Sequence, residues 1–253
     1  RLQSLYRYIV RKTLSTPLLF RPAGYFLRHS KINSKAIKPK IINSSVLLMG
    51  GCVQPSLAPN INHSIKNILA KLNIEVLESS QGECCGALDQ HLAASSDALK
   101  KVKRNIDNWI SKLDSGVEAI ISSASGCGVM IKDYPNLFEE SDPYYEKSLL
   151  ISSKTKDIAE FLVNQDLSSL KLKELNIAYH EPCTMQHGQK LGGLVESILS
   201  EFGYNKKQIK DSHICCGSAG TYSVFETKIA NQLRSNKIDN LNASKPKMIV
   251  TSN

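Results

Sequence analysis

The chain has 253 residues, of which 42% are hydrophobic and 22% charged, a balance typical of a globular protein with one large or two small domains. No apolar run approaches the roughly 18 residues that a membrane-spanning helix needs. The formal net charge is +9, and residues 1–74 account for the basic excess, because they hold 12 Lys and Arg and no Asp or Glu while the rest of the chain has 20 basic and 23 acidic residues. Nucleic acid is not an expected partner, because no recognition module accompanies this charge.

Residues 1–44 form a basic segment that we expect to be a helical linker. Basic side chains such as Arg7 and Arg21 alternate with aromatic ones such as Tyr8 and Phe26. This mixture suits contact with an acidic partner or an anionic membrane surface, and it is also found in organelle transit peptides and in solvated linker helices. Because the chain starts at Arg1 and stops at the end of a predicted strand, we expect it to be part of a longer protein.

The first unit, residues 45–140, alternates predicted strands and helices. Short apolar runs indicate strands, and apolar residues at helical spacing indicate helices. In chain order we expect a strand at 45–51, a helix at 57–72, a strand at 74–77, a helix at 93–113, a strand at 117–122 and a short helix ending near Tyr134.

The second unit, residues 176–253, repeats this order. We expect a strand at 177–180, helices at 191–202 and 224–241, and a last strand at 248–251. Residues 141–175 are predicted to connect the units through a helix at 154–162 and to take no part in chemistry. The alternation predicts an α/β fold in which two similar β-α-β-type cysteine-rich units, each with a largely parallel sheet, follow the basic helical segment.

The chain has seven cysteines, and three of the first unit recur at the same spacing in the second. Cys84-Cys85-Gly86 recurs as Cys215-Cys216-Gly217, and a single cysteine, Cys52 or Cys183, precedes each pair by 32 residues. This match indicates an internal duplication. A glycine after two cysteines can adopt a positive φ, which allows a sharp turn that points both thiols at one centre. The predicted strands place these cysteines after strand ends, where α/β sheets bind ligands.

The cysteines are candidate metal ligands. Four in the first unit, Cys52, Cys84, Cys85 and Cys127, are enough for one [4Fe–4S] cluster or for one zinc site with four cysteine ligands. Their spacing favours iron–sulfur, because zinc sites usually contain two cysteines separated by only two to four residues, and this chain has no such pair. The second unit offers Cys183, Cys215 and Cys216, and the counterpart of Cys127 is expected about three residues past Asn253.

The histidines near the cysteines are expected to have smaller roles at the metal sites. Any of His180, His187 and His213 could complete the second site, although His180 and His213 are expected to donate hydrogen bonds to sulfur rather than to bind metal. The other histidines, His29, His63 and His91, are expected to be ordinary surface or helix residues.

No catalytic residue or nucleotide site is predicted. Glu181 and Asp211 have no partner at a spacing that indicates acid–base chemistry. The chain also lacks a G-x-G-x-x-G loop, so a flavin or nicotinamide site is not expected.

Several motifs resemble a known family over roughly residues 45–253. The most specific stretches are Gly51–Pro55, Glu83–Leu88, Ala124–Gly128 with Lys132–Tyr134, Tyr179–Cys183, Gln186–Gln189 and Cys215–Tyr222. They resemble the duplicated cysteine-rich CCG domain of heterodisulfide reductase, of lactate-utilisation proteins and of the iron–sulfur subunit of glycolate oxidase (glycolate dehydrogenase). The similarity to the glycolate oxidase subunit is the strongest.

The resemblance implies a division of labour between subunits. A separate flavoprotein would oxidise glycolate to glyoxylate, and this chain would pass the electrons through iron–sulfur centres to a quinone or another acceptor. The resemblance also implies a ferredoxin-like domain with two [4Fe–4S] clusters before Arg1. The family pattern often ends in Cys-x-x-Cys, but Ala124 and Met130 stand at that spacing from Cys127. A five-cysteine noncubane cluster is therefore not expected, whereas a four-cysteine site is.

Two other classes remain open from the sequence. The chain could be a docking module whose cysteine sites hold zinc or nothing, or a thiol–disulfide enzyme similar to heterodisulfide reductase. Cysteine-rich sites indicate a reducing compartment, so we expect the cytoplasm, with peripheral attachment to the inner membrane as a further option.

Overall fold

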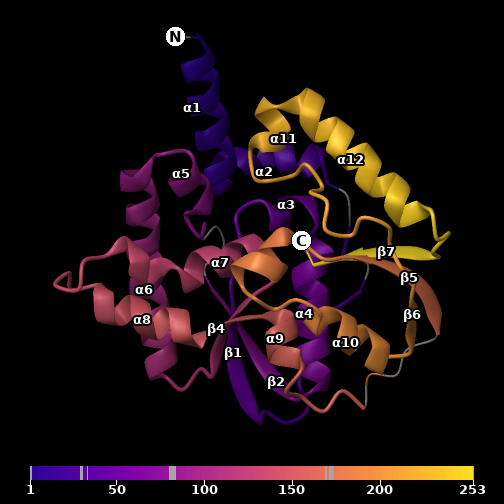
Figure 1. Ribbon diagram of the computed structural model, residues 1–253. Coiled ribbons are helices and arrows are strands. Elements are labelled where there is room, and N and C mark those ends of the chain that lie inside the picture. The colour runs from indigo at the N-terminus through magenta and orange to yellow at the C-terminus, as the bar shows by residue number, and fades with distance from the viewer. Residues whose placement is uncertain are drawn as a thin grey trace. The chain divides into compact units, whose positions relative to one another are not determined.

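The computed structural model describes residues 2–28, 31–32, 34–79, 84–168, 170 and 174–252. The chain divides into two compact units, Arg1–Phe161 and Leu162–Asn253, coloured indigo to orange and orange to yellow in Figure 1. Each unit contains a parallel sheet, which confirms the predicted α/β fold with two duplicated units.

The first unit begins with two helices, α1 (Leu2–Ser15) and α2 (Pro17–Phe26). Its sheet consists of β1 (Ser44–Leu48), β2 (Ile74–Glu78), β3 (Ala119–Ser122) and β4 (Thr155–Asp157). The connecting helices are α3 (Gln54–Leu57), α4 (Pro59–Lys71), α5 (Ala87–His91), α6 (Ser95–Asp114), α7 (Ser125–Lys132), the 3-10 helix η1 (Tyr134–Leu137), α8 (Tyr145–Lys154) and α9 (Ile158–Leu162).

The strand order of the first sheet is β2-β1-β3-β4, with every neighbouring pair parallel. Side chains alternate between the two faces of a strand. On one face, Leu47 and Ile120 are fully buried in a core that they share with residues of α6, α7 and α8. Burial of each such side chain contributes about 1.5–3 kcal/mol.

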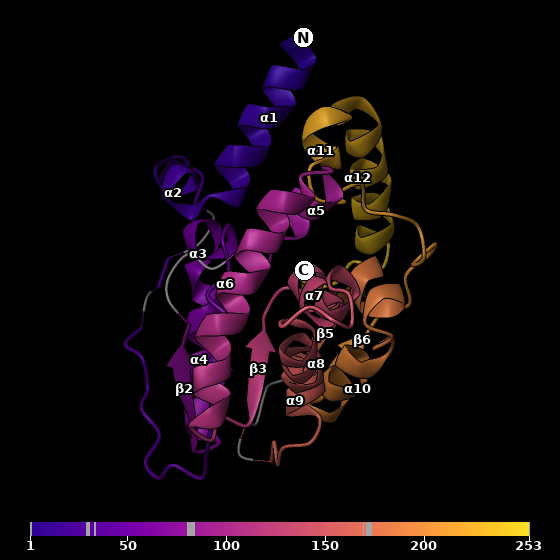
Figure 2. The same cartoon turned by 90° about the vertical axis from the view of Figure 1, so that its left-hand side faces the viewer.

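Helix α6 packs through one stripe of residues. Ala98, Val102, Ile106 and Trp109 recur at helical spacing and are almost fully buried, whereas the opposite face is polar. Trp109 stacks on Tyr134, with 6.4 Å between the ring centroids. Figure 2 shows α6 as a long helix of the first unit that begins beside α5. Helix α6 is therefore well packed in the core, and the loop that carries Cys84 and Cys85 packs against it.

The second unit contains a smaller sheet of the same design. Its strands are β5 (Leu175–His180), β6 (Tyr204–Lys206) and β7 (Met248–Thr251), in the order β6-β5-β7 and all parallel. Its helices are the π-helix η2 (Thr184–Gly188), α10 (Leu194–Glu201), α11 (Tyr222–Phe225) and α12 (Thr227–Asn242). As in the first unit, the first strand lies between the second and the third.

The structure corrects the helix predicted at 154–162. Residues 155–157 form β4, whose Ile120–Thr155 and Ser122–Asp157 pairings attach it to β3. Thr155 and Asp157 are both buried, so pairing with the sheet outweighs the local helical pattern in this segment.

Other predicted helices begin later than expected, α4 and α10 among them. Pro59 starts α4 after the separate short helix α3, because proline fits the first helical turn and not a helix interior. Gly193 has a φ of +80° and delays the start of α10 to Leu194. Within the described parts of the chain, every helix is too short or too polar to cross a lipid bilayer.

Candidate metal centre

The first cysteine site lies beyond the carboxyl ends of three strands. Cys52 follows β1, Cys84 and Cys85 follow β2, and Cys127 lies in the first turn of α7 after β3. The chain continues from β1 to β2 on one side and from β3 to β4 on the other, so β1 and β3 flank the switch point where α/β sheets bind ligands. The fold thus brings the four predicted ligands to the edge of the sheet where α/β proteins bind ligands.

The four thiols of the first unit lie in contact with one another. Cys85 Sγ donates to Cys127 Sγ at 3.3 Å. Cys84 hydrogen-bonds both to Cys52 and to Cys85. Cys84 and Cys85 are 1% and 3% exposed, whereas Cys52 and Cys127 are half-buried. The sulfur atoms therefore form one group that is closed to solvent on the side of the vicinal pair.

The contacts among the thiols shift the pKa values of three of them, one downward and two upward. Hydrogen bonds from Cys52 and Cys85 lower the pKa of Cys84, and the Gly86 N–H and the Lys101 charge act in the same direction. The pKa of Cys52 is raised by its hydrogen bond to Cys84 and by burial, and that of Cys85 by its bonds to Cys127 and Cys84. The shifts make Cys84 more acidic than Cys52 and Cys85, and metal binding requires cysteine ligands to be deprotonated.

Two buried polar side chains donate hydrogen bonds to the backbone carbonyls of the vicinal cysteine pair. Asn105 Nδ2 donates to the Cys84 carbonyl at 2.9 Å and to the Tyr134 hydroxyl at 3.0 Å, and that hydroxyl donates to the Cys85 carbonyl at 3.0 Å. Both side chains are fully buried. Loss of either would leave a buried carbonyl without its donor, at a cost of about 1–3 kcal/mol.

A second network ties together the loops after β1, β2 and β3. Gln54 Nε2 donates to Asn62 Oδ1 and to Ser123 Oγ, both at 2.9 Å. Asn62 Nδ2 donates to the Gly50 carbonyl at 3.1 Å, and the Gly50 N–H donates to Ser79 Oγ at 2.9 Å. Of these residues, only Gln54 lies in one of the motifs identified from the sequence. The others had no sequence signal, because the bonds join segments that are far apart in the chain.

The donor set fits an iron–sulfur cluster by its chemistry. Four cysteine thiolates are the ligands that a [4Fe–4S] cluster takes, and here they converge from three loops. Sulfur atoms 3.3 Å apart leave no room for iron between them, so binding requires the side chains to separate. Among the described residues, no group of three or more His, Cys, Asp or Glu side chains is already arranged around one metal ion.

The second unit repeats the turn but exposes its thiols. The Gly217 N–H donates to Cys215 Sγ at 3.3 Å, as the Gly86 N–H does to Cys84. Gly217 and Gly86 have φ values of +79° and +91°, which confirms the predicted left-handed turn after each cysteine pair. Cys183 and Cys215 are exposed and Cys216 is half-buried.

The three histidines of the second unit differ in burial. His180 Nδ1 contacts Thr251 Oγ1 on β7 at 3.2 Å. Burial lowers the pKa of His180, and the charge of Lys237 lowers it further. His187 and His213 are exposed.

Glu181 and Asp211 take part in hydrogen bonds that hold the local backbone. Glu181 Oε1 accepts the Gly193 N–H at 2.8 Å and so fixes the turn before α10. The backbone carbonyl of Asp211 accepts a bond from Lys237 Nζ at 3.4 Å. His91 is exposed at the end of α5, and His29 lies outside the described residues.

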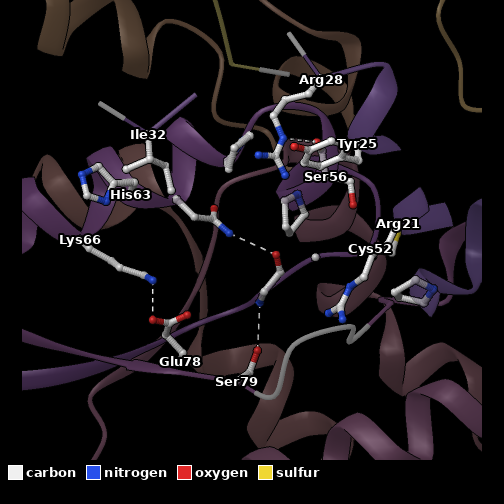
Figure 3. Close-up of a pocket in the computed structure, with 16 residues that line it drawn as sticks. Arg21, Tyr25, Arg28, Ile32, Cys52, Ser56, His63, Lys66, Glu78 and Ser79 are labelled. Atoms are coloured by element: carbon white, nitrogen blue, oxygen red, sulfur yellow. Dashed lines mark hydrogen bonds and ion pairs between the residues drawn. The ribbon is translucent and has the colours of Figure 1, made fainter. Parts of the chain in front are cut away.

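A pocket of about 420 Å³ opens beside Cys52 (Figure 3). Its wall includes the cationic residues Arg21, Arg28 and Lys66, and Lys66 pairs with Glu78. The Arg28 guanidinium lies 5.0 Å from the centroid of the Tyr25 ring, and its Nε donates to the Ser56 carbonyl at 3.3 Å. The wall next to Cys52 is therefore cationic and partly aromatic.

His63 also lines this pocket, which the sequence did not indicate. Its Nε2 contacts Ser34 Oγ at 2.9 Å and Asn67 Nδ2 at 3.1 Å. It lies on α4, and it lines the same pocket as Cys52. No local signal could have placed it there, because α2, α4 and the loop after β1 meet only in the folded unit.

Comparison with known proteins places these features in a family. Residues 46–132 and 177–253 match the cysteine-rich domain family model named CCG. The glycolate oxidase iron-sulfur subunit of Escherichia coli (strain K12) is 37% identical over 96% of this chain and 64% of its own length. The probable glycolate oxidase iron-sulfur subunit of Bacillus subtilis (strain 168) is 24% identical over 96% of this chain and 54% of its own length.

A third relative extends the comparison. Lactate utilization protein A of Bacillus licheniformis is 26% identical over 74% of this chain and 78% of its own length. The chain thus spans 64% and 54% of the two glycolate oxidase relatives, and the resemblance predicted from the motifs is confirmed. Because the two matched segments cover more than half of it, the chain belongs to the cysteine-rich CCG domain family and contains two copies of that domain.

Proposed function

We propose that the chain is an iron–sulfur electron-transfer subunit of a glycolate, or 2-hydroxy-acid, dehydrogenase complex. The observation that supports this most is the convergence of four cysteine thiols at the strand ends of the first unit. The second unit repeats the turn that presents the vicinal pair, and two relatives are named as glycolate oxidase iron–sulfur subunits.

The seven cysteines are the proposed ligands. Cys52, Cys84, Cys85 and Cys127 would hold one cluster of the [4Fe–4S] type, because four thiolates match its ligand number. Cys183, Cys215 and Cys216 would supply three ligands of a second cluster. A bound cluster supplies one-electron chemistry. The chain itself positions the sulfur atoms and shields the buried pair from water.

The rest of the complex follows from the family resemblance. Electrons would come from a flavoprotein subunit that oxidises the hydroxy acid, and would leave to a quinone or another acceptor. A ferredoxin-like domain would precede this chain. The seven free cysteines suit a reducing compartment such as the cytoplasm.

A surface formed by α1 and α2 suits peripheral attachment to an anionic membrane. Leu5, Leu18 and Phe26 are 54%, 77% and 87% exposed on these helices, and the exposed residues Arg7 and Arg21 lie among them. Exposed apolar side chains mixed with cations are typical of helices that lie in a lipid interface. We call this the α1–α2 surface.

Iron and acid-labile sulfide analysis of the full-length protein, purified without oxygen, tests the proposal. We expect Cys84→Ser and Cys216→Ser each to lose about four iron and four sulfide relative to the wild type, because each removes a ligand of a different [4Fe–4S] cluster. EPR should show a different signal missing in each variant. Each variant serves as the control for the other unit.

Two results would contradict this proposal. One is zinc in place of iron in the wild-type units, which would favour the docking-module alternative. The other is unchanged iron in both variants, which would place all iron in another part of the protein.

A further inference from the structure

Helices α6 and α12 occupy equivalent places in the two units. Ala98, Asn105 and Trp109 on α6 are buried, and on α12 the residues with the same spacing, Ala230, Lys237 and Leu241, are buried too. The glycine after each cysteine pair faces the first residue of its set: a Cβ on Gly86 would lie 3.4 Å from the Ala98 carbonyl oxygen, and one on Gly217 would lie 2.5 Å from that of Ala230. Asn105 and Lys237 are therefore counterparts.

Both counterparts donate hydrogen bonds to the backbone of the cysteine loop. Asn105 holds the Cys84 carbonyl at 2.9 Å. Lys237 Nζ donates to the Ser212 carbonyl at 2.9 Å and to the Asp211 carbonyl at 3.4 Å, in the segment that leads to Cys215. The position serves one purpose in both units, which is to anchor the loop that presents the vicinal thiols.

The two counterparts differ in charge. Lys237 is 3% exposed, and none of the ion pairs between described residues includes it. A buried ammonium is costly unless negative charge lies near it. In the first unit the nearby cation Lys101 pairs with the buried carboxylate Asp89, so much of its charge is already balanced. Lys237 Nζ instead contacts two backbone carbonyls in the segment that leads to the exposed Cys215.

We propose that Lys237 is the positioning residue and the counter-charge of the second cysteine site. Its side chain fixes the loop at 211–216, and its positive charge stabilises the additional electron on a cluster held by Cys183, Cys215 and Cys216. Nearby charge and hydrogen bonding set the potentials of iron–sulfur clusters. The reduction potential of the second cluster is thus higher than it would be with a neutral side chain at this position. The inference rests on the proposed function.

The test compares Lys237→Met with two controls in the full-length protein. Lys237→Arg keeps the charge, and Lys228→Met removes an exposed charge from the same helix. In the metal-free protein we expect amide hydrogen exchange over residues 207–217 to become about tenfold faster in Lys237→Met. We expect exchange in the two control variants to stay near that of the wild type.

Redox titration followed by EPR tests the charge. We expect the potential of the second cluster to fall in Lys237→Met, to stay near the wild-type value in both control variants, and the first cluster to be unaffected. If Lys237→Met does not fold, Lys237→Gln is measured instead, with the same expected fall. A potential that does not move, or that moves equally in Lys228→Met, overturns the counter-charge; unchanged exchange overturns the positioning role.

Failure of the proposed function gives a different result. If the second unit of the wild type binds no iron, there is no second potential to titrate and the proposed function fails there. The hydrogen-exchange comparison then still decides whether Lys237 holds the loop, because it uses metal-free protein.

Discussion

Gly217 shows how one residue fixes the geometry of a cysteine pair. Its φ of +79° is in the left-handed region, and its missing side chain lets the loop approach the Ala230 carbonyl on α12. Any other residue would be strained at this φ, and its side chain would also collide with the Ala230 carbonyl. The Cys-Cys-Gly triplet is thus a packing requirement as well as a turn.

Replacing this glycine separates the two effects. In Gly217→Ala the added Cβ would lie 2.5 Å from the Ala230 carbonyl oxygen. The left-handed backbone alone costs a non-glycine residue about 1–2 kcal/mol. Because the collision adds to this strain, we expect the free energy of unfolding of the second unit to fall by more than that amount. Gly116→Ala is the control, because Gly116 has a φ of +93° and open space around it. Urea denaturation measures both. An equal loss in the two variants would contradict a close approach to α12.

At the scale of elements, α1 is attached to the first unit through buried charges. Arg11 is 8% exposed and donates to Asp89 at 2.7 Å and to Asp97 at 2.8 Å. Lys101 on α6 also pairs with Asp89, which lies in the first turn of α5. In the sequence Arg11 is one of many basic residues of the first segment, whereas the fold uses it to hold α1 against α5 and α6.

Removing the shared carboxylate should detach α1. Asp89→Asn leaves the charges of Arg11 and Lys101 facing a neutral amide, so we expect the free energy of unfolding to fall by about 3–5 kcal/mol. Asp114→Asn, an exposed position at the end of α6, is the control and should change it by about 0.5 kcal/mol or less. Thermal or urea denaturation gives both values. A loss in Asp89→Asn as small as in the control would show that the network does not hold α1.

The same attachment should depend on pH through Asp97. Hydrogen bonds from Lys12 and Arg11 lower the pKa of Asp97 from 3.8 to about 2. The pKa is lower in the folded protein, so the stabilisation is complete above pH 3.8 and is lost as the pH falls toward 2. Limited proteolysis of α1 with an acid-active protease should show that the wild type and Asp97→Asn differ at about pH 5 and converge near pH 2. A constant difference would exclude Asp97 as the titrating group.

At the scale of the whole molecule, positive charge and exposed apolar side chains gather in one part of the chain. The α1–α2 surface combines Leu18, Phe26 and Arg21, and residues 1–74 contain no acid that could repel an anionic surface. Each Lys or Arg near an anionic lipid surface contributes about 1 kcal/mol to binding. Electrostatic attraction and apolar insertion would therefore act together.

Sedimentation with anionic vesicles tests this surface. We expect Leu18→Glu combined with Phe26→Glu to abolish binding, and Ile229→Glu, at a residue 54% exposed in the second unit, to leave it intact. Raising the ionic strength from about 0.1 M to about 1 M should weaken wild-type binding, because the Debye length falls from about 10 Å to about 3 Å. Equal binding to neutral vesicles would argue against an electrostatic contribution.

Much of the fold could be predicted from local pattern. The strand at Met248–Thr251 matches the prediction residue for residue, and most other predicted strands and helices are present with shifted ends. The segment at 155–157 was missed because its strand is defined by pairing with β3 and not by its own sequence. The contact among the four thiols of the first unit agrees with the predicted grouping, although their role as ligands remains a prediction.

The sequence by itself determined the duplication, the α/β alternation and the sharp turn after each cysteine pair, because spacing and glycine placement are local properties of the chain. Only the tertiary structure decided what surrounds the sulfur atoms. Asn105 and Tyr134 reach the vicinal pair across 21 and 49 residues, and Lys237 reaches the second loop across 25. Contacts between such distant residues depend on how helices pack on the sheets, and no local periodicity in the chain encodes that packing.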